Sequence, residues 1–298
     1  MSTRSQLLAL NDELRRLKAG GQRVVAVTEE GLGQLRAAVS ASQAEPAATI
    51  MAESPAPFVA PAVRRAAAPT PGVAPIPAEP PVVNLPDGDK AARWAALRDL
   101  VLHHPVCLAH VRPGKKVVLG VGSLDAQIFF CGEAPGADEE VQGEPFVGAA
   151  GQLLTRMIQG MGLKREQVYI GNIMNWRPEM AAGAGGVQMG NRPPTPEEMS
   201  FCLPFLRAQL QIVQPQVIVA LGKTAAEGLL GSGTFKAVGD VRGRWHTFAG
   251  VPLMVSYHPS YILRSQSISS KRAIWEDLLK VMERVTLPIS EKQRNYFR

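Results

Sequence analysis

Four short apolar runs, separated by longer stretches with helical spacing, constrain the fold of this chain more than any other feature. The runs resemble buried strands and lie at 126–131, 168–172, 217–221 and 252–258. Helical stretches alternate with them, at 91–103, 150–161, 196–213, 223–230 and 270–285. Such alternation is typical of a parallel sheet with helices on both faces. The sequence therefore predicts an α/β fold, a three-layer α/β/α sandwich with a central four-stranded parallel sheet.

Local chemistry marks one helix start. Thr195 is a typical N-cap, Pro196 suits the first helical position, and Glu198 stands three residues after the cap. This spacing predicts a capping box at the start of the helix 196–213.

The chain ahead of this domain has a different composition. Residues 1–44 carry leucines at near-helical spacing but are too few for a core of their own. They are interpreted either as a poorly ordered helical tail or as a segment that recruits a protein partner. Residues 45–90 are rich in alanine and proline, and proline removes a backbone donor, so a disordered linker is expected there. The folded domain is expected at 91–288, followed by a C-terminal tail at 289–298.

Charge and cysteine content narrow the class of protein. The net charge of +6 over 298 residues suits a polyanionic partner such as DNA without requiring one. The three cysteines (Cys107, Cys131 and Cys202) are too few for a disulfide framework and fit a reducing compartment. No run approaches the roughly 20 apolar residues of a membrane span, and the first residues lack a signal peptide's apolar core. We therefore expect a soluble, cytoplasmic, monomeric protein without a membrane partner.

Several polar and aromatic residues stand where the predicted strands end, which is where α/β sheets bind ligands. The first strand runs into a Gly-Glu-Ala-Pro-Gly turn (132–136) whose backbone can approach a ligand closely. Glu133 can orient a water there, or the turn can be an acidic surface loop. Asn172 ends the second strand and can read a base edge or form a turn. Phe146, in a glycine-flanked loop, can stack on a base or belong to the core, and His258 ends the fourth strand.

Taken together, the motifs are more specific than any one of them. The chain carries, in this order, GEAPG-x2-E, PFVG-x2-G-x-LL, N-x3-WRP, NRPPTPEE-x3-C-x-PFL, VIVALG-x2-A and HPSYILR. Over about residues 100–285 they resemble the type-four, iron–sulfur branch of the uracil-DNA glycosylases. The resemblance implies a monofunctional enzyme that hydrolyses the N-glycosidic bond of uracil in DNA and initiates base-excision repair.

The resemblance also implies roles for individual residues. Phe146 would be the stacking platform for a uracil flipped out of the duplex, Asn172 would read its O4 and N3–H, and His258 would donate to its O2. Glu133 is the candidate for positioning the attacking water, and Glu139 is a second candidate. The remaining implied contacts are backbone contacts with the base at Gly132 and Ala134, and a DNA wedge and phosphate contact at Leu263 and Arg264.

The chain departs from this family at the cluster positions. The family holds its cluster with four cysteines, and the matching positions here read His104, Cys107, Trp176 and Cys202. Tryptophan cannot ligate iron, so we expect no cluster, no other cofactor and no metal, with Trp176 filling the volume. A cluster that uses His104 as a ligand stays open as the alternative. Cys131 is interpreted as a buried strand residue.

Two questions stay open at this point. A non-catalytic relative that binds uracil or abasic sites in DNA is a second hypothesis, although the intact set of pocket residues favours the enzyme. The Gly/Ala-rich insertion 179–190 can be a solvent loop or a DNA contact. It contains no histidine, lysine or arginine, so the covalent DNA trapping of a related branch is not expected.

Overall fold

The computed structural model describes residues 75–180, 188 and 190–298. The expected N-terminal segment 1–44, most of the Ala/Pro linker and the middle of the insertion lie outside the described residues. The fold and the site are therefore those of the C-terminal domain.

The last part of the expected linker belongs to this domain. Residues 75–89 form no helix or strand, but Ile76, Val83 and Leu85 pack against the hydrophobic core. Prolines keep the segment extended, and the apolar side chains between them bury surface. Residues ahead of the expected domain start at 91 therefore contribute apolar side chains to the core.

The sheet has six strands in the order β1-β3-β2-β4-β6-β5. Its four central strands pair in parallel and are β3 (Tyr169–Asn172), β2 (Ile128–Gly132), β4 (Val217–Leu221) and β6 (Val251–Ser256). They correspond to the four predicted runs, so the parallel core is confirmed. The first three are buried along their whole length, so their sequences consist mostly of apolar residues.

The two edge strands have no signature that predicts them from the sequence. β1 (Val121–Gly122) pairs antiparallel with β3, and β5 (Trp245–Phe248) pairs antiparallel with β6. β1 has only two residues, and β5 mixes exposed with buried side chains, so neither resembles the continuous central runs. The sheet is therefore a parallel core with antiparallel edges, not four parallel strands alone.

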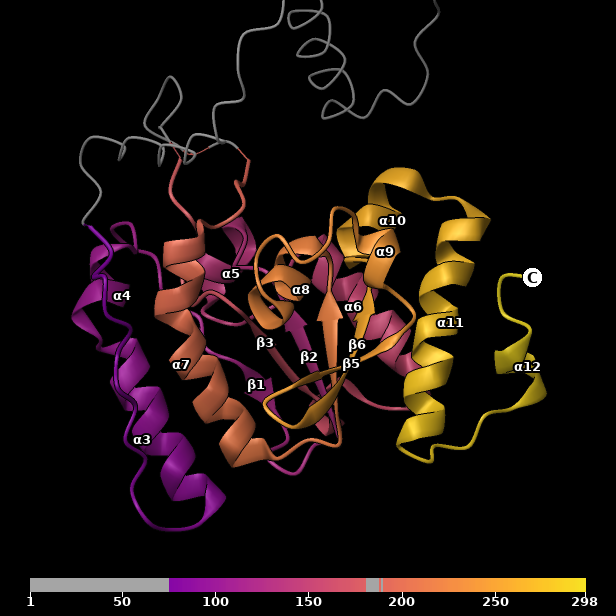
Figure 1. Ribbon diagram of the computed structural model, residues 1–298, viewed down its shortest axis with the longest axis horizontal. Coiled ribbons are helices and arrows are strands. Elements are labelled where there is room, and N and C mark those ends of the chain that lie inside the picture. The colour runs from indigo at the N-terminus through magenta and orange to yellow at the C-terminus, as the bar shows by residue number, and fades with distance from the viewer. Residues whose placement is uncertain (1–74, 181–187, 189) are drawn as a thin grey trace, which may run out of the picture. The chain divides into compact units, whose positions relative to one another are not determined.

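Helices cover both faces of the sheet, which confirms the three layers (Figure 1). One face is packed by α3 (Lys90–Leu102), α4 (Pro105–Ala109), α7 (Pro196–Val213) and α8 (Lys223–Leu230). The other face is packed by α6 (Ala149–Gly160), α10 (Pro259–Ser265) and α11 (Ile268–Arg284). The short elements are α5 (Ala137–Gln142), the 3-10 turn η1 (Arg165–Gln167), α9 (Val238–Val241) and α12 (Glu291–Arg294). None of the described helices is long and apolar enough to cross a membrane.

The segment 289–298 is not a free tail. The indole N–H of Trp275 in α11 donates to the Gln293 carbonyl at 2.6 Å, and Gln293 Nε2 donates to the Gly160 carbonyl at 2.8 Å. The Tyr296 ring lies 5.1 Å from the Trp275 ring. A buried indole N–H needs a partner, and this segment supplies it. The C-terminal segment is therefore part of the domain.

Candidate active site

The carboxyl ends of β2 and β3 bring two of the predicted residues side by side. Gly132 ends β2, Asn172 ends β3, and the two are partners in the parallel register. β2 has β3 on one side and β4 on the other: the connection after β2 leads to one side, and the connection after β3 crosses to the opposite side. Ligands bind at such a switch point of an α/β sheet.

Gly132, Phe146, Asn172 and His258 lie close together at this edge. A Cβ atom at Gly132 would lie 2.4 Å from Asn172 Oδ1 and 2.4 Å from Phe146 Cζ, so only glycine leaves both side chains in place. The centroids of the Phe146 and His258 rings are 5.6 Å apart, with the ring planes 30° from parallel. Asn172 is 6% exposed, and its amide makes no hydrogen bond with any residue in the described part of the chain. A nearly buried amide with both functions free can pair with the edge of a planar ligand.

The loop that presents Phe146 has a strained backbone. Phe146 has a φ of 55°, in the left-handed region that non-glycine residues rarely adopt. Its carbonyl oxygen would lie 1.8 Å from a Cβ atom at position 151, so Gly151 lets α6 approach the loop. Arg165 Nη2 donates to the Pro145 carbonyl at 2.6 Å. Strain of this kind persists only where the surroundings hold it, and it concentrates at binding sites.

Glu139, the second candidate for positioning a water, holds this loop instead. Its Oε1 accepts from the backbone N–H groups of Val147 and Gly148, each at 3.0 Å. Its Oε2 accepts from the backbone N–H of Gly136 at 3.0 Å, at the start of α5. Three backbone donors occupy the carboxylate, so Glu139 is a support of the Phe146 loop and is not carried forward as a water-positioning group.

Hydrogen bonds to His258 set its tautomer. His258 is the N-cap of α10, and its Nδ1 accepts from the backbone N–H of Ser260 at 3.1 Å. Ser260 Oγ lies 2.8 Å from the same nitrogen and accepts from Arg264 Nη1 at 3.2 Å. Because a backbone N–H can only donate, the proton of the neutral ring resides on Nε2. Burial, with a further contribution from Arg264, lowers the pKa of His258 to about 4, so the ring is neutral at pH 7.

Glu133 lies at the same edge, beside the start of α8. Burial raises the pKa of its carboxyl, a hydrogen bond with Thr224 opposes this, and the neighbouring charge of Glu227 adds to it. Both neighbours belong to α8, which follows the end of β4. The carboxyl group is thus held between the ends of two central strands.

The other predicted residues are divided between the core and the surface. Ala134 is partly buried and packs against the core, so its side chain is structural. Leu263 and Arg264 lie on α10, five and six residues after His258, and both are exposed. An apolar and a cationic side chain are thereby placed on the helix that His258 starts.

Comparison with known proteins decides the family. The sequence model described as the uracil DNA glycosylase superfamily matches residues 119–279, which include Gly132, Phe146, Asn172, His258 and α10. The chain belongs to this superfamily. It is 42% identical over 167 residues to the type-4 uracil-DNA glycosylase of Thermotoga maritima, covering 55% of this chain and 80% of that protein. It is 43% identical over 152 residues to the type-4 uracil-DNA glycosylase of Archaeoglobus fulgidus, covering 49% and 71%.

Sequence identities to type-4 and type-5 uracil-DNA glycosylases show which branch of the superfamily the chain is most similar to. A type-5 uracil-DNA glycosylase of Pyrobaculum aerophilum is 29% identical over 168 residues, covering 55% of this chain and 72% of that protein. Both type-4 proteins are more similar than this. The predicted type-4 branch of the uracil-DNA glycosylases is confirmed.

The donors at the cluster positions of this branch do not fit an iron–sulfur cluster. Cys107 and Cys202 are fully buried, and burial raises the pKa of the Cys107 thiol to about 12 and that of Cys202 above its usual range. His104 Nδ1 accepts from the Val106 N–H at 3.3 Å, as the N-cap of α4. Across the described residues, no group of three histidine, cysteine or acidic side chains is arranged to hold a metal. A cluster needs more thiolates than this set supplies.

Trp176 lies at the remaining cluster position and is part of the core. It is 1% exposed, its ring stacks on His110 with the centroids 5.0 Å apart, and it lies 6.1 Å from the Phe201 ring. Burial lowers the pKa of His110, so an uncharged ring faces the indole. Cys131 is also fully buried, within β2 as expected.

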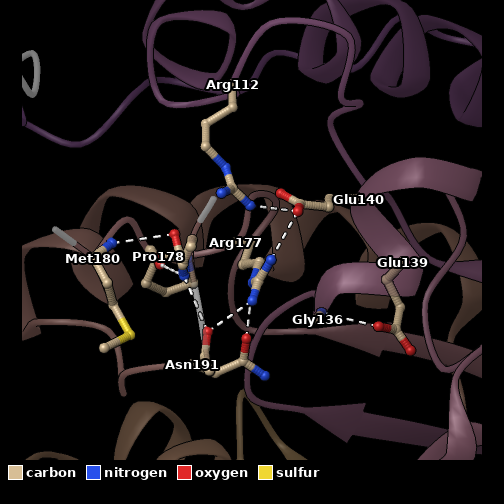
Figure 2. A network of polar contacts seen from close by, with 10 residues as sticks. Arg112, Gly136, Glu139, Glu140, Arg177, Pro178, Met180 and Asn191 are labelled. Carbon is tan, nitrogen blue, oxygen red and sulfur yellow. Dashed lines mark hydrogen bonds and ion pairs between the residues drawn. The ribbon is translucent and has the colours of Figure 1, made fainter. Parts of the chain in front are cut away.

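A buried ionic network joins the segments around these positions (Figure 2). Glu140 of α5 accepts from Arg112 and from Arg177, whose Nη1 lies 2.8 Å from Glu140 Oε1. Arg177 also donates to Asn191 Oδ1 at 2.8 Å and to the Gly190 carbonyl at 2.7 Å. Burial raises the pKa of Glu140, but the two arginines outweigh it and the net shift is downward. The network therefore ties the segment after α4, the segment after β3 and the end of the insertion to α5.

Two residues that matter here, Ser260 beside His258 and Glu140 in the ionic network, are not among the residues predicted from the sequence. Ser260 contacts His258, and its signal is a hydroxyl two residues after a histidine that starts a helix. Glu140 belongs to the acidic run 138–140, which the sequence predicts to lie on the surface. It is buried because Arg112 and Arg177 pair with it.

Proposed function

We propose that this chain is a monofunctional uracil-DNA glycosylase, which hydrolyses the N-glycosidic bond of uracil in DNA and so initiates base-excision repair. The proposal rests on the pocket at the ends of β2 and β3, in a chain of this superfamily. A stacking ring, a free amide and a neutral imidazole with an N–H donor converge there.

Recognition follows from the shape and polarity of the pocket. Uracil enters it after leaving the base stack, and Phe146 offers an aromatic face for stacking. Asn172 Oδ1 accepts from N3–H of the base and Nδ2 donates to O4. Cytosine carries an amino group in place of O4, so two donors would face one another and cytosine is rejected.

Catalysis is assigned to His258 and Glu133. Negative charge develops on the base as the C1′–N1 bond breaks, and His258 Nε2–H donates to O2, where this charge accumulates. Glu133 orients a water toward the oxocarbenium-like C1′. The water oxygen bonds to C1′, its proton passes through the carboxylate to solvent, and uracil leaves with the electron pair.

We expect excision to depend little on pH across the neutral range as far as His258 is concerned. Its pKa of about 4 keeps the ring neutral, with its proton on Nε2, until the pH falls well below the ordinary 6.5. kcat/KM measured against pH should show no loss near 6.5, and the loss due to this group should come as the pH approaches 4. A fall centred near 6.5 that is absent from His258→Ala would contradict the assignment.

We expect DNA binding to weaken steeply with salt. Arg264 is exposed on α10, where we expect it to contact a DNA phosphate. We expect Leu263 to fill the gap that the flipped base leaves in the duplex. Arg264→Ala should reduce the slope of log K against log salt by about one, because one fewer phosphate is neutralised. The slope is measured by fluorescence anisotropy with a labelled duplex, and Arg98→Ala, an exposed arginine of α3, serves as the control.

The proposal also covers the cofactor, the cellular location, the oligomeric state and the partners of the protein. It works without an iron–sulfur cluster, because the donors at the cluster positions do not fit one. Its three cysteines are free and buried, which suits the reducing conditions of the cytoplasm. It acts as a monomer on uracil-containing DNA, and residues 1–44 offer a contact for a protein partner.

Incubation with uracil-containing oligonucleotides tests the function. We expect free uracil and an abasic site from U·G, U·A or single-stranded substrate, with strand cleavage only after alkali. None of the four pocket residues is a lysine, so no Schiff base is formed that would cut the strand. Tight binding to these substrates without release of uracil would show instead that the protein binds uracil in DNA without excising it.

A further inference from the structure

A cavity with a volume of about 460 Å³ lies between α6, α10, α11 and the C-terminal segment, away from the candidate uracil site. Phe146 and His258 stand before the first residues of α6 and α10, so the uracil pocket is at the N-terminal ends of these helices. The cavity is lined instead from their later turns, by residues between Leu153 and Gly160 and between Ile262 and Gln266. The two sites are therefore distinct but share the same pair of helices.

The charged and polar groups at this cavity suit an anionic ligand with hydrogen-bonding edges. Its lining includes Arg156 and Lys271 and no acidic residue. Neither cation forms an ion pair with any residue that the structure describes. The exposed side-chain amide of Gln266 provides N–H donors and a carbonyl acceptor. Most of the other lining residues are apolar or aromatic, so the cavity combines apolar surface with two cations, as a site for a base beside a phosphate would.

Aromatic rings form one wall of the cavity. Tyr296 lies 5.1 Å from Trp275 and 6.1 Å from Phe297, measured between ring centroids. Phe297 is 45% exposed and has a φ of 60°, so an apolar ring lies open to solvent at a backbone conformation that non-glycine residues rarely adopt. Exposed aromatic faces bind single-stranded nucleic acids by stacking on their bases.

We propose that this cavity binds a second, unpaired nucleobase of the DNA strand that carries the uracil. Leu263 lines the cavity and lies five residues after His258, about 7.5 Å along the helix. A strand with its uracil in the first pocket thus reaches the cavity with a nearby nucleotide. The proposal rests on the proposed function for the identity of the strand, and it makes single-stranded or locally melted DNA the preferred substrate.

Substrates that lack one base test the proposal with the full-length protein. Single-stranded oligonucleotides carry one uracil and, at one nearby position, an abasic analogue in place of a normal base. For the wild type, the analogue should raise KM about tenfold at one position on one side of the uracil, with kcat unchanged. Phe297→Ala, which removes the exposed ring, and Leu153→Trp, which fills the cavity, should erase this difference. Matched substitutions at exposed residues elsewhere, Trp245→Ala in β5 and Leu100→Trp in α3, should preserve it.

A binding measurement separates this proposal from the glycosylase activity. The dissociation constant of a short single-stranded oligonucleotide without uracil should rise about tenfold in Phe297→Ala and Leu153→Trp. This result is expected even if no uracil is released from any substrate. Unchanged dissociation constants in both variants, or equal effects of the analogue at every position, would overturn the proposal and leave the cavity as a protein-binding surface.

Discussion

Replacing His258 with alanine is expected to lower kcat for uracil excision by about a hundredfold or more, with a much smaller change in KM. The reason is that the Nε2–H donor is used when charge develops on the departing base, so its removal costs transition-state stabilisation. Donors of this kind contribute a few kcal/mol. The measurement is steady-state excision from a single-stranded uracil oligonucleotide, with cleavage of the abasic product by alkali.

Two controls keep this result specific to the donor. His258 also caps α10 through Nδ1, and loss of a cap costs about 1 kcal/mol, so the melting temperature of the variant must show that the domain stays folded. His103→Ala removes an exposed histidine of the same chain and should leave kcat at the wild-type value. A folded His258→Ala enzyme with wild-type kcat would remove His258 from the mechanism.

The Trp176→Ala substitution is expected to reduce the free energy of unfolding by about 3–5 kcal/mol, the range for a buried tryptophan replaced by alanine. The indole is 1% exposed and stacks on His110, so its removal leaves a cavity between α4 and α7 that the neighbouring side chains cannot fill. Urea denaturation measures the change. Trp245→Ala, at a position 40% exposed, should cost less than about 1 kcal/mol.

The same position tests the missing cluster. Trp176→Cys places a cysteine at a third of the four cluster positions, but His104 still stands at the remaining one. We therefore expect neither colour nor stoichiometric iron and sulfide after anaerobic purification of this variant. The wild type should likewise contain neither. Stoichiometric iron and sulfide in the wild type would show that His104 completes a cluster and that Trp176 is not a substitute for it.

Most of the central fold could be predicted because its signals are local. The box at the start of α7 is an example: Thr195 Oγ1 accepts from the Glu198 N–H at 3.2 Å, and Glu198 Oε2 accepts from the Thr195 N–H at 2.7 Å. Both partners lie within four residues, so spacing alone reveals them. The run 217–221 coincides with β4, because a strand buried on both faces is apolar at every position.

The edges and ends of the domain could not be predicted in this way. β1 is a strand only because β3 lies beside it, and two residues carry no period. The segment 289–298 is charged and short, and it is ordered by the Trp275 indole and the Gly160 carbonyl, which are distant in the sequence. Order in such segments depends on partners that their own residues do not specify.

The sequence by itself predicted the candidate residues of the uracil site, and it predicted that Gly132, Asn172 and His258 follow or end central strands of the sheet. Their types and order were sufficient, because a parallel sheet brings the carboxyl ends of its strands to one edge.

Only the tertiary structure decided what each group can do there. Glu133 and Glu139 are the same residue type in one motif, yet three backbone N–H groups occupy Glu139, while Glu133 faces Thr224. The proton of His258 is on Nε2 because Ser260 donates to Nδ1 and burial keeps the ring neutral. Protonation and free hydrogen-bonding capacity depend on the surrounding charges, donors and solvent access, and these are fixed only when distant segments pack together.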